Sequence, residues 1–198
     1  MKAKEKSQEN KTGDIPRGGR LADYVCYYLS PLGGITLSSN GTELTGLWFD
    51  GQKYFGDTLA KEYEEQALPI FEQTVRWLDT YFSGKAPDFT PPILIKTTPF
   101  RKAVWKIMLE IPFGQTMTYG EIADRLAKQN GLSKMSAQAV GGAVGHNSVS
   151  LIIPCHRVVG TNGSLTGYAG GIDKKVRLLE LEKADMSSLF VPKKGTAL

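Results

Sequence analysis

A cysteine and a histidine stand side by side in the stretch Pro154-Cys155-His156-Arg157, and this pair is the chain's best candidate for covalent chemistry. A cysteine reacts as its thiolate, and an ordinary thiol pKa near ~8.5 leaves only a small fraction ionised at neutral pH. A base such as His156 would therefore have to help Cys155. Neighbouring residues of an extended chain point to opposite sides. Unless the chain turns there, we expect a water molecule to carry the proton between the two side chains.

The histidine would itself need an acceptor that fixes which ring nitrogen carries the proton. Glu182, on the last predicted helix, is a candidate, but sequence spacing alone does not select it. An isolated cysteine after an apolar run is more often an inert buried residue. The dipeptide by itself leaves the catalytic and the structural interpretations open.

The composition indicates a globular protein. The chain has 198 residues, of which 41% are hydrophobic and 22% charged, enough for one or two domains. No apolar run approaches the ~20 residues that cross a bilayer, and residues 1–20 lack a signal-peptide core. We therefore expect a disordered tail at 1–20, a cytoplasmic location and no membrane contact. Two cysteines are too few for a disulfide framework. A structural zinc site needs four Cys or His ligands at close paired spacing, and Cys26 stands far from the other three such residues, so we expect no metal.

Charge divides the chain into two parts. Residues 21–92 hold 4 Lys and Arg against 10 Asp and Glu, a net of −6, whereas residues 93–183 hold 12 against 6, a net of +6. This division suggests two domains, of which the second meets a polyanion. Unevenly charged solvated faces would explain the same numbers, so charge leaves both interpretations open.

The first part predicts a small α+β unit. The elements expected are a strand, turn and strand over 24–37, a hairpin turn at Asn40-Gly41, a strand over 44–49 and a helix over 60–82. Residues 85–92, which follow Gly84 and contain three prolines, predict a linker between domains at 21–84 and 93–183. Residues 184–198 are expected to form a tail.

The second part predicts helices with clear start signals. Thr98-Pro99 is an N-cap followed by proline, and Thr118 with Glu121 has capping-box spacing for a helix over 119–129. Ser133 is expected to cap a helix over 134–145. Short strands are expected at 151–153 and 158–159, and a last helix over 173–182.

Two short helices followed by a β element fit a winged helix-turn-helix, in which the second helix faces DNA. That helix is built mostly of alanine and glycine, and only Lys134 and Gln138 are long and polar. Small side chains would let the backbone approach DNA without reading base edges. Tight packing against another helix is the competing explanation.

With these residues in place, a resemblance becomes specific. The stretch from Ile153 to Val159 (IPCHRVV) resembles the active-site signature of the O6-alkylguanine-DNA alkyltransferases, also called methylated-DNA–protein-cysteine methyltransferases. The resemblance extends closely over 93–183 and more loosely over the first part. The matching segments include Thr98-Pro99-Phe100, Ile111-Pro112-Phe113-Gly114, Thr118-Tyr119-Gly120-Glu121, Ala139-Val140-Gly141-Gly142, Asn147 and Thr166-Gly167-Tyr168-Ala169-Gly170.

The resemblance implies a role for each matching residue. Cys155 would accept the alkyl group, and His156 and Glu182 would activate it through a water molecule. Tyr119 would contact the flipped guanine and assist its departure, while Asn147 would brace the turn before the active-site strand. The remaining residues implied are Val158, Tyr168 and Ala169 for substrate, and Thr118, Ser133, Lys134, Gln138, Gly141 and Arg157 for DNA.

The same resemblance implies an N-terminal ribonuclease-H-like domain, a C-terminal winged-helix domain and a single-use reaction without an organic cofactor. The partner would be double-stranded DNA that contains O6-alkylguanine, with O4-alkylthymine as a second candidate substrate and a monomer as the active form. This chain departs from the pattern at Gln138, where the family commonly has an arginine that fills the gap left by the flipped base. The zinc ligands and the extra cysteine-rich segment of some relatives are also missing.

Two other functions stay open at this point. A lesion-sensing or transcriptional DNA-binding protein would never react, and a non-catalytic branch of the family replaces the cysteine that this chain keeps as Cys155. A cysteine hydrolase would form only a transient acyl adduct. The mass of the intact chain after incubation with alkylated DNA distinguishes all three.

Overall fold

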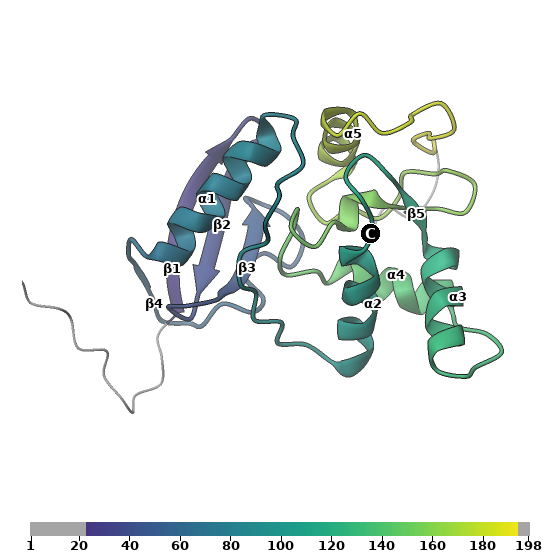
Figure 1. Ribbon diagram of the computed structural model, residues 1–198, viewed down its shortest axis with the longest axis horizontal. Coiled ribbons are helices and arrows are strands. Elements are labelled where there is room, and N and C mark those ends of the chain that lie inside the picture. The colour runs from purple at the N-terminus through teal and green to yellow at the C-terminus, as the bar shows by residue number, and fades with distance from the viewer. Residues whose placement is uncertain (1–22, 194–198) are drawn as a thin grey trace, which may run out of the picture.

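The computed structural model describes residues 23–193, and its elements form a sheet-containing group and a helical group that lie side by side (Figure 1). The predicted tail at 1–20 lies outside the described residues. The α+β fold class is confirmed.

The N-terminal part is a four-stranded sheet covered on one face by a helix (Figure 1). Its strands are β1 (Asp23–Ser30), β2 (Gly33–Ser39), β3 (Leu44–Phe49) and β4 (Tyr63–Glu65), in the order β3-β2-β1-β4. The first three strands pair antiparallel, as the turn signals predicted, and β4 pairs parallel with β1. Helix α1 (Pro69–Phe82) packs on this sheet.

The prediction of one helix over 60–82 was wrong in its first part, because the helix begins only at Pro69. Leu68 is extended, with φ −132° and ψ 148°. Proline is well placed at the first helical position, where no N–H is needed, but it forces the preceding residue out of the helical region. Residues 63–65 instead extend the sheet as β4.

The C-terminal part is a group of helices with a two-stranded ribbon. Its elements are α2 (Pro99–Leu109), β5 (Met117–Thr118), α3 (Tyr119–Gln129), α4 (Ala137–Gly145), the 3₁₀ helix η1 (Cys155–Arg157), β6 (Val158–Val159) and α5 (Ile172–Leu181). The Thr98 cap of α2 and the capping box of Thr118 and Glu121 at α3 are both confirmed.

Two local predictions in this part were wrong. Ser136 rather than Ser133 caps α4, because the Ser136 hydroxyl accepts from Ala139 N at 3.3 Å. Residues 151–153 form a turn rather than a strand, with Leu151 at φ 68°. The backbone just before them already pairs with β3, through Leu47 N to Ser148 O at 2.8 Å and Ser150 N to Leu47 O at 2.9 Å.

That pairing joins the two parts of the chain. A single hydrophobic core runs from the sheet through α1 into the helical group, and it includes Leu47, Tyr81, Trp105 and Cys155. Helix α1 and the loop around η1 therefore pack in the same hydrophobic core.

The expected tail also begins later than predicted. Ala184 is buried with Leu179, and Leu165 N donates to Phe190 O at 2.8 Å, so residues 184–190 pack on the helical group. None of the helices within residues 23–193 combines the length and apolar character needed to cross a membrane.

Candidate active site

Cys155 lies in the short turn η1, immediately after Pro154, and its side chain is buried. The chain therefore turns at the cysteine, and the extended geometry considered for this stretch does not apply. Asn147, which follows α4, donates from Nδ2 to Cys155 Sγ at 3.2 Å and to Ile153 O at 2.7 Å. Its Oδ1 accepts from Val149 N at 3.0 Å. Asn147 thus holds both the thiol and the turn that precedes it.

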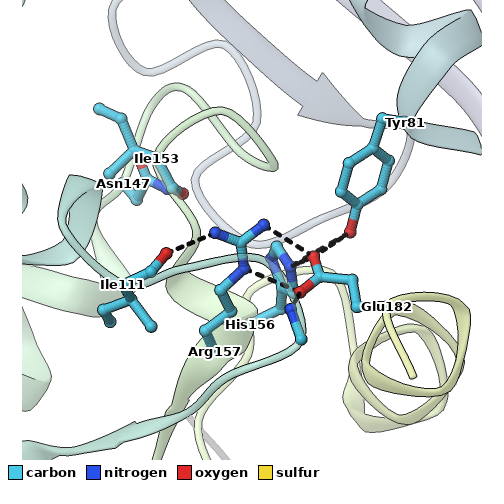
Figure 2. A network of polar contacts seen from close by, with 8 residues as sticks. Tyr81, Ile111, Asn147, Ile153, His156, Arg157 and Glu182 are labelled. Atoms are coloured by element: carbon cyan, nitrogen blue, oxygen red, sulfur yellow. Dashed lines mark hydrogen bonds and ion pairs between the residues drawn. The ribbon is translucent and has the colours of Figure 1, made fainter. Parts of the chain in front are cut away.

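The ring of His156 is completely buried and points its Nε2 at Glu182 Oε1, 2.6 Å away (Figure 2). Glu182 is the C-cap residue of α5. The other ring nitrogen, Nδ1, is buried and has no hydrogen-bond partner among residues 23–193. Since Nε2 faces a carboxylate, it carries the proton in the neutral ring, and Nδ1 remains as the basic nitrogen.

Four further groups donate to Glu182. Arg157 donates from Nε to Oε2 at 2.8 Å and from Nη2 to Oε1 at 3.0 Å. Gly114 N donates to Oε2 at 2.9 Å, and the Tyr81 hydroxyl donates to Oε1 at 2.6 Å. A buried carboxylate with this many donors stays ionised, and a protonated His156 next to it would be stabilised.

Arg157 was predicted to bind DNA, and the structure places it elsewhere. Its side chain is buried, and Nη1 donates to Ile111 O at 2.6 Å while the other nitrogens hold Glu182 (Figure 2). The turn at η1 directs the guanidinium inward, toward the carboxylate, so it is not available to a phosphate.

Burial sets the resting protonation of the pair. Burial raises the pKa of the Cys155 thiol, although the Asn147 hydrogen bond and the charge of Lys175 act in the opposite direction. Burial lowers the pKa of His156 despite its contact with Glu182. Although burial opposes ionisation of Glu182, hydrogen bonds from His156 and Arg157 hold the pKa of that carboxyl well below its usual range. The resting site is therefore a neutral thiol beside a neutral imidazole.

Two tyrosines also lie near the thiol. Tyr119, the first residue of α3, donates to Thr166 O at 3.2 Å, and burial together with the nearby Cys155 raises its pKa to about 12. Tyr168 is buried, its hydroxyl has no partner among the described residues, and burial followed by the proximity of Cys155 raises its pKa well above the usual value. Both hydroxyls therefore stay protonated and can donate a hydrogen bond to a nucleobase placed beside Cys155.

The other two predicted substrate residues offer backbone atoms. Val158 is buried in β6 and its carbonyl accepts from Lys175 Nζ at 2.6 Å. Ala169 is half-buried, and its carbonyl accepts from Lys53 N at 3.0 Å. Neither side chain is polar, so any contact with substrate would come from shape and backbone.

Most of the predicted DNA-binding residues are accessible. Ser133, Lys134 and Gln138 are exposed, whereas Thr118 and Gly141 are half-buried. The Thr118 hydroxyl is occupied by the capping box, donating to Glu121 Oε2 at 2.9 Å. A hollow of about 660 Å³ runs between α3 and α4, lined by Gly120, Ala123, Asp124, Lys134, Met135, Ser136 and Ala137.

The small residues of α4 allow tight packing on one face of the helix and leave space on the other. Val140, Ala143 and Val144 are buried against the neighbouring helices. On the other face, a Cβ at Gly142 would meet no atom within 4 Å, so this side of α4 has open space. The helix thus packs with one face and leaves a smooth one uncovered.

Sequence reasoning missed two residues of the site. Lys175 is completely buried, its Nζ donates to Val158 O at 2.6 Å and Thr166 O at 2.8 Å, and burial lowers its pKa to about 8. It lies four residues before Leu179, on the apolar stripe of α5, and a lysine on that stripe was the available signal. Tyr81 lies three residues after Leu78 on the buried face of α1, where nothing distinguished it from a core aromatic.

Comparison with known proteins finds matches over nearly the whole described chain. Residues 24–95 match the family described as "6-O-methylguanine DNA methyltransferase, ribonuclease-like domain". Residues 99–184 match "6-O-methylguanine DNA methyltransferase, DNA binding domain". The methylated-DNA–protein-cysteine methyltransferase of Mycobacterium tuberculosis is 42% identical over 155 residues, which are 78% of this chain and 89% of that protein. The Haemophilus influenzae protein of the same name is 37% identical over 81% of this chain and 86% of its own length.

Similar solved structures come from the same family. The crystal structure of Mycobacterium tuberculosis OGT in complex with DNA has a TM-score of 0.69 and 41% identity, and it covers 81% of this chain and 92% of that chain. An O6-methylguanine DNA methyltransferase from Methanococcus jannaschii has a TM-score of 0.52 and 31% identity, over 82% and 95% of the two chains.

Proposed function

The chain belongs to the methylated-DNA–protein-cysteine methyltransferase family and repairs DNA by moving a methyl group onto one of its own cysteines, and we propose that this cysteine is Cys155. One observation carries the proposal: the Cys155 thiol accepts a hydrogen bond from Asn147, and the next residue, His156, is a buried histidine backed by Glu182. The other cysteine, Cys26, is half-buried on β1, and within residues 23–193 its thiol forms a hydrogen bond only with Tyr27 O, at 3.8 Å.

Activation begins with loss of the thiol proton. The basic Nδ1 of His156 receives it, through a water molecule as the family resemblance implies, and the resulting imidazolium is stabilised by the ionised Glu182. Two contacts stabilise the thiolate, namely the Asn147 amide and the positive charge of Lys175. Burial keeps the resting thiol neutral, and these two groups offset the effect of burial only once the thiol proton has moved to His156.

The thiolate then attacks the alkyl carbon. The S–C bond forms as the C–O6 bond breaks, and guanine leaves with the bonding electron pair. Tyr119 donates a proton to the departing guanine, which leaves a tyrosinate at Tyr119 and an imidazolium at His156. One proton then passes from the imidazolium to the tyrosinate through water, so over the whole reaction the thiol loses one proton and the base gains one. The thioether that results cannot be reversed by thiol exchange, and each chain therefore acts once.

The substrate must reach a buried sulfur. O6 of guanine lies inside the stacked duplex, so the nucleotide has to rotate out of the helix before it can enter the site. We propose double-stranded DNA with O6-alkylguanine as the partner, held by the exposed Lys134 just before α4 and by α4 itself, with its exposed Gln138 and its smooth outer face. Val158, Tyr168 and Ala169 would then enclose the flipped base.

A monomer is sufficient for this chemistry. The thiol, the Asn147 donor, the histidine and the carboxylate all belong to one chain. We therefore propose that the active form is monomeric.

Intact-mass measurement after incubation with a duplex that contains one O6-methylguanine tests the proposal. The wild-type chain should gain one stable methyl group, and peptide mapping should place it on Cys155. Cys155→Ala should gain none while still binding DNA. A methyl group on Cys26 would refute the assignment, no added mass would favour a DNA-binding protein that never reacts, and only a transient acyl adduct would favour a hydrolase.

A further inference from the structure

Tyr81 connects the N-terminal part of the chain to the relay behind Cys155. It lies on α1, and its side chain is completely buried. Its hydroxyl donates to Glu182 Oε1 at 2.6 Å, and the same oxygen is 3.2 Å from His156 Nε2 (Figure 2). The phenol therefore touches both groups that would stabilise the proton taken from the thiol.

Aromatic rings from both parts of the chain fix this hydroxyl in place. The Tyr81 ring stacks on Trp77, with centroids 5.3 Å apart and planes 7° from parallel. It also meets Phe113 edge-on at 5.8 Å. Because the ring is held on both sides, its hydroxyl can set the position of the carboxylate rather than follow it.

The two carboxylate oxygens of Glu182 are held differently. Oε2 is held by Arg157 Nε and Gly114 N, both from the C-terminal part. Oε1, which faces His156, is held by Arg157 Nη2 at 3.0 Å and by the shorter bond from Tyr81. The shortest contact that orients the catalytic oxygen of Glu182, apart from His156 itself, thus comes from α1.

We propose that Tyr81 is a positioning residue for alkyl transfer, through which the N-terminal part of the chain sets the geometry of the His156–Glu182 pair. This inference rests on the proposed function, since it concerns the rate at which the Cys155 thiol is activated. It assigns the N-terminal part a place in the chemistry, in addition to its packing against the helical group.

Tyr81→Phe tests the inference because it removes only the hydroxyl and keeps the stacked ring. The matched control is Tyr28→Phe. The Tyr28 hydroxyl, on β1, also donates to a carboxylate, namely Asp79 Oδ1 at 2.8 Å. Asp79 lies on α1, as Tyr81 does, but away from the relay. Both variants and the wild type are mixed with an O6-methylguanine duplex in single-turnover reactions at saturating protein. The dissociation constant for the duplex is measured separately.

We expect Tyr81→Phe to lower the transfer rate constant about tenfold, which corresponds to about 1.4 kcal/mol in the activation barrier, with an unchanged dissociation constant. Tyr28→Phe should change neither quantity. The proton resonance of the His156 Nε2–H group should shift in Tyr81→Phe and stay in place in Tyr28→Phe. The chain has only two histidines, so this resonance can be assigned.

A transfer rate and a His156 resonance that match wild type in Tyr81→Phe would overturn the inference. It would also be overturned by a loss of rate in Tyr81→Phe that is reproduced by Tyr28→Phe, since general loosening of α1 would then explain both. The wild-type reaction separates the two proposals. If the wild-type chain takes up no methyl group, the proposed function fails and this role with it, whereas an active wild type with a wild-type-like Tyr81→Phe refutes only the role of Tyr81.

Discussion

Glu182→Gln should destabilise the chain far more than the same change at Glu110, although each carboxylate forms an ion pair with an arginine. Glu182 and Arg157 meet at 2.8 Å, and their side chains are 0% and 10% exposed. Glu110 and Arg125 meet at 3.2 Å on the surface, where their side chains are 60% and 49% exposed. The comparison separates what burial does from what pairing does.

The contacts of Glu182 indicate the size of the effect. Every hydrogen-bond partner of the two carboxylate oxygens is a donor, so the NH₂ group of a glutamine would face other donors in either orientation. In one orientation it would face Arg157 Nε and Gly114 N, and in the other the His156 ring, Tyr81 and Arg157 Nη2. Removing one partner of a buried pair costs about 3–5 kcal/mol. For a chain of this size each kcal/mol lowers Tm by roughly 2–4 °C, which gives a fall of roughly 6–20 °C. An exposed pair contributes about 1 kcal/mol or less, so Glu110→Gln should lower Tm by no more than about 4 °C.

The difference in unfolding free energy between wild type and Glu182→Gln should also depend on pH. The pKa of Glu182 is depressed in the folded chain, so its contribution to stability is fully present above the unfolded value of 4.5. That contribution is lost as the pH falls from there through the folded pKa. Thermal unfolding should therefore show a constant difference at neutral and mildly acidic pH and a shrinking one below about 4.5.

Equal shifts in Glu182→Gln and Glu110→Gln would refute the reasoning, because burial would then have no special weight. A difference that persisted undiminished far below the unfolded pKa would refute the assignment of an ionised Glu182. Methyl transfer by Glu182→Gln is measured below its own unfolding temperature, where the loss of the carboxylate should still slow the reaction strongly.

Three further predictions follow from single residues. Lys175→Met should slow methyl transfer and move its rate–pH profile to higher pH, because the charge that lowers the pKa of Cys155 is lost; an unchanged profile would contradict this. Lys134→Gln should reduce the slope of log affinity against log salt by about 1, since one phosphate contact is lost, and an unchanged slope would place Lys134 off the DNA. Gln138→Arg should speed repair of duplex DNA, because a longer, charged side chain fills the gap of the flipped base better, with little effect on free O6-alkylguanine base; equal acceleration of both substrates would exclude that explanation.

Local signals in the sequence predicted the elements that depend on local contacts. The cap of α2 at Thr98 and the capping box of α3 depend on hydroxyls a few residues from the amides they bind, so spacing was sufficient. The strand over 44–49 was likewise bounded by its own turn residues. The start of α1 was missed although Pro69 was visible, because the apolar spacing upstream of it also fits a helix.

Contacts between residues far apart in the sequence determine the features that were predicted wrongly. Residues 151–153 are as apolar as a strand, yet they turn because the residues before them pair with Leu47, more than a hundred positions away. Arg157 was predicted to bind DNA on the basis of the family resemblance. Only the position of Glu182 in space shows that this arginine is needed inside.

The neutral resting state of Cys155 and His156 suits a protein that can react only once. A permanently ionised thiolate would be open to oxidation and to other alkylating agents, and each such event would consume a whole chain. Here burial raises the pKa of Cys155 and lowers that of His156, so the resting pair is neutral. The groups that stabilise the charged pair, Asn147 and Lys175 beside the thiol and Glu182 beside the ring, are nevertheless fixed in advance. We therefore expect these groups to lower the barrier to ionisation when an alkylated base lies against the sulfur, while burial keeps the thiol mostly protonated at other times.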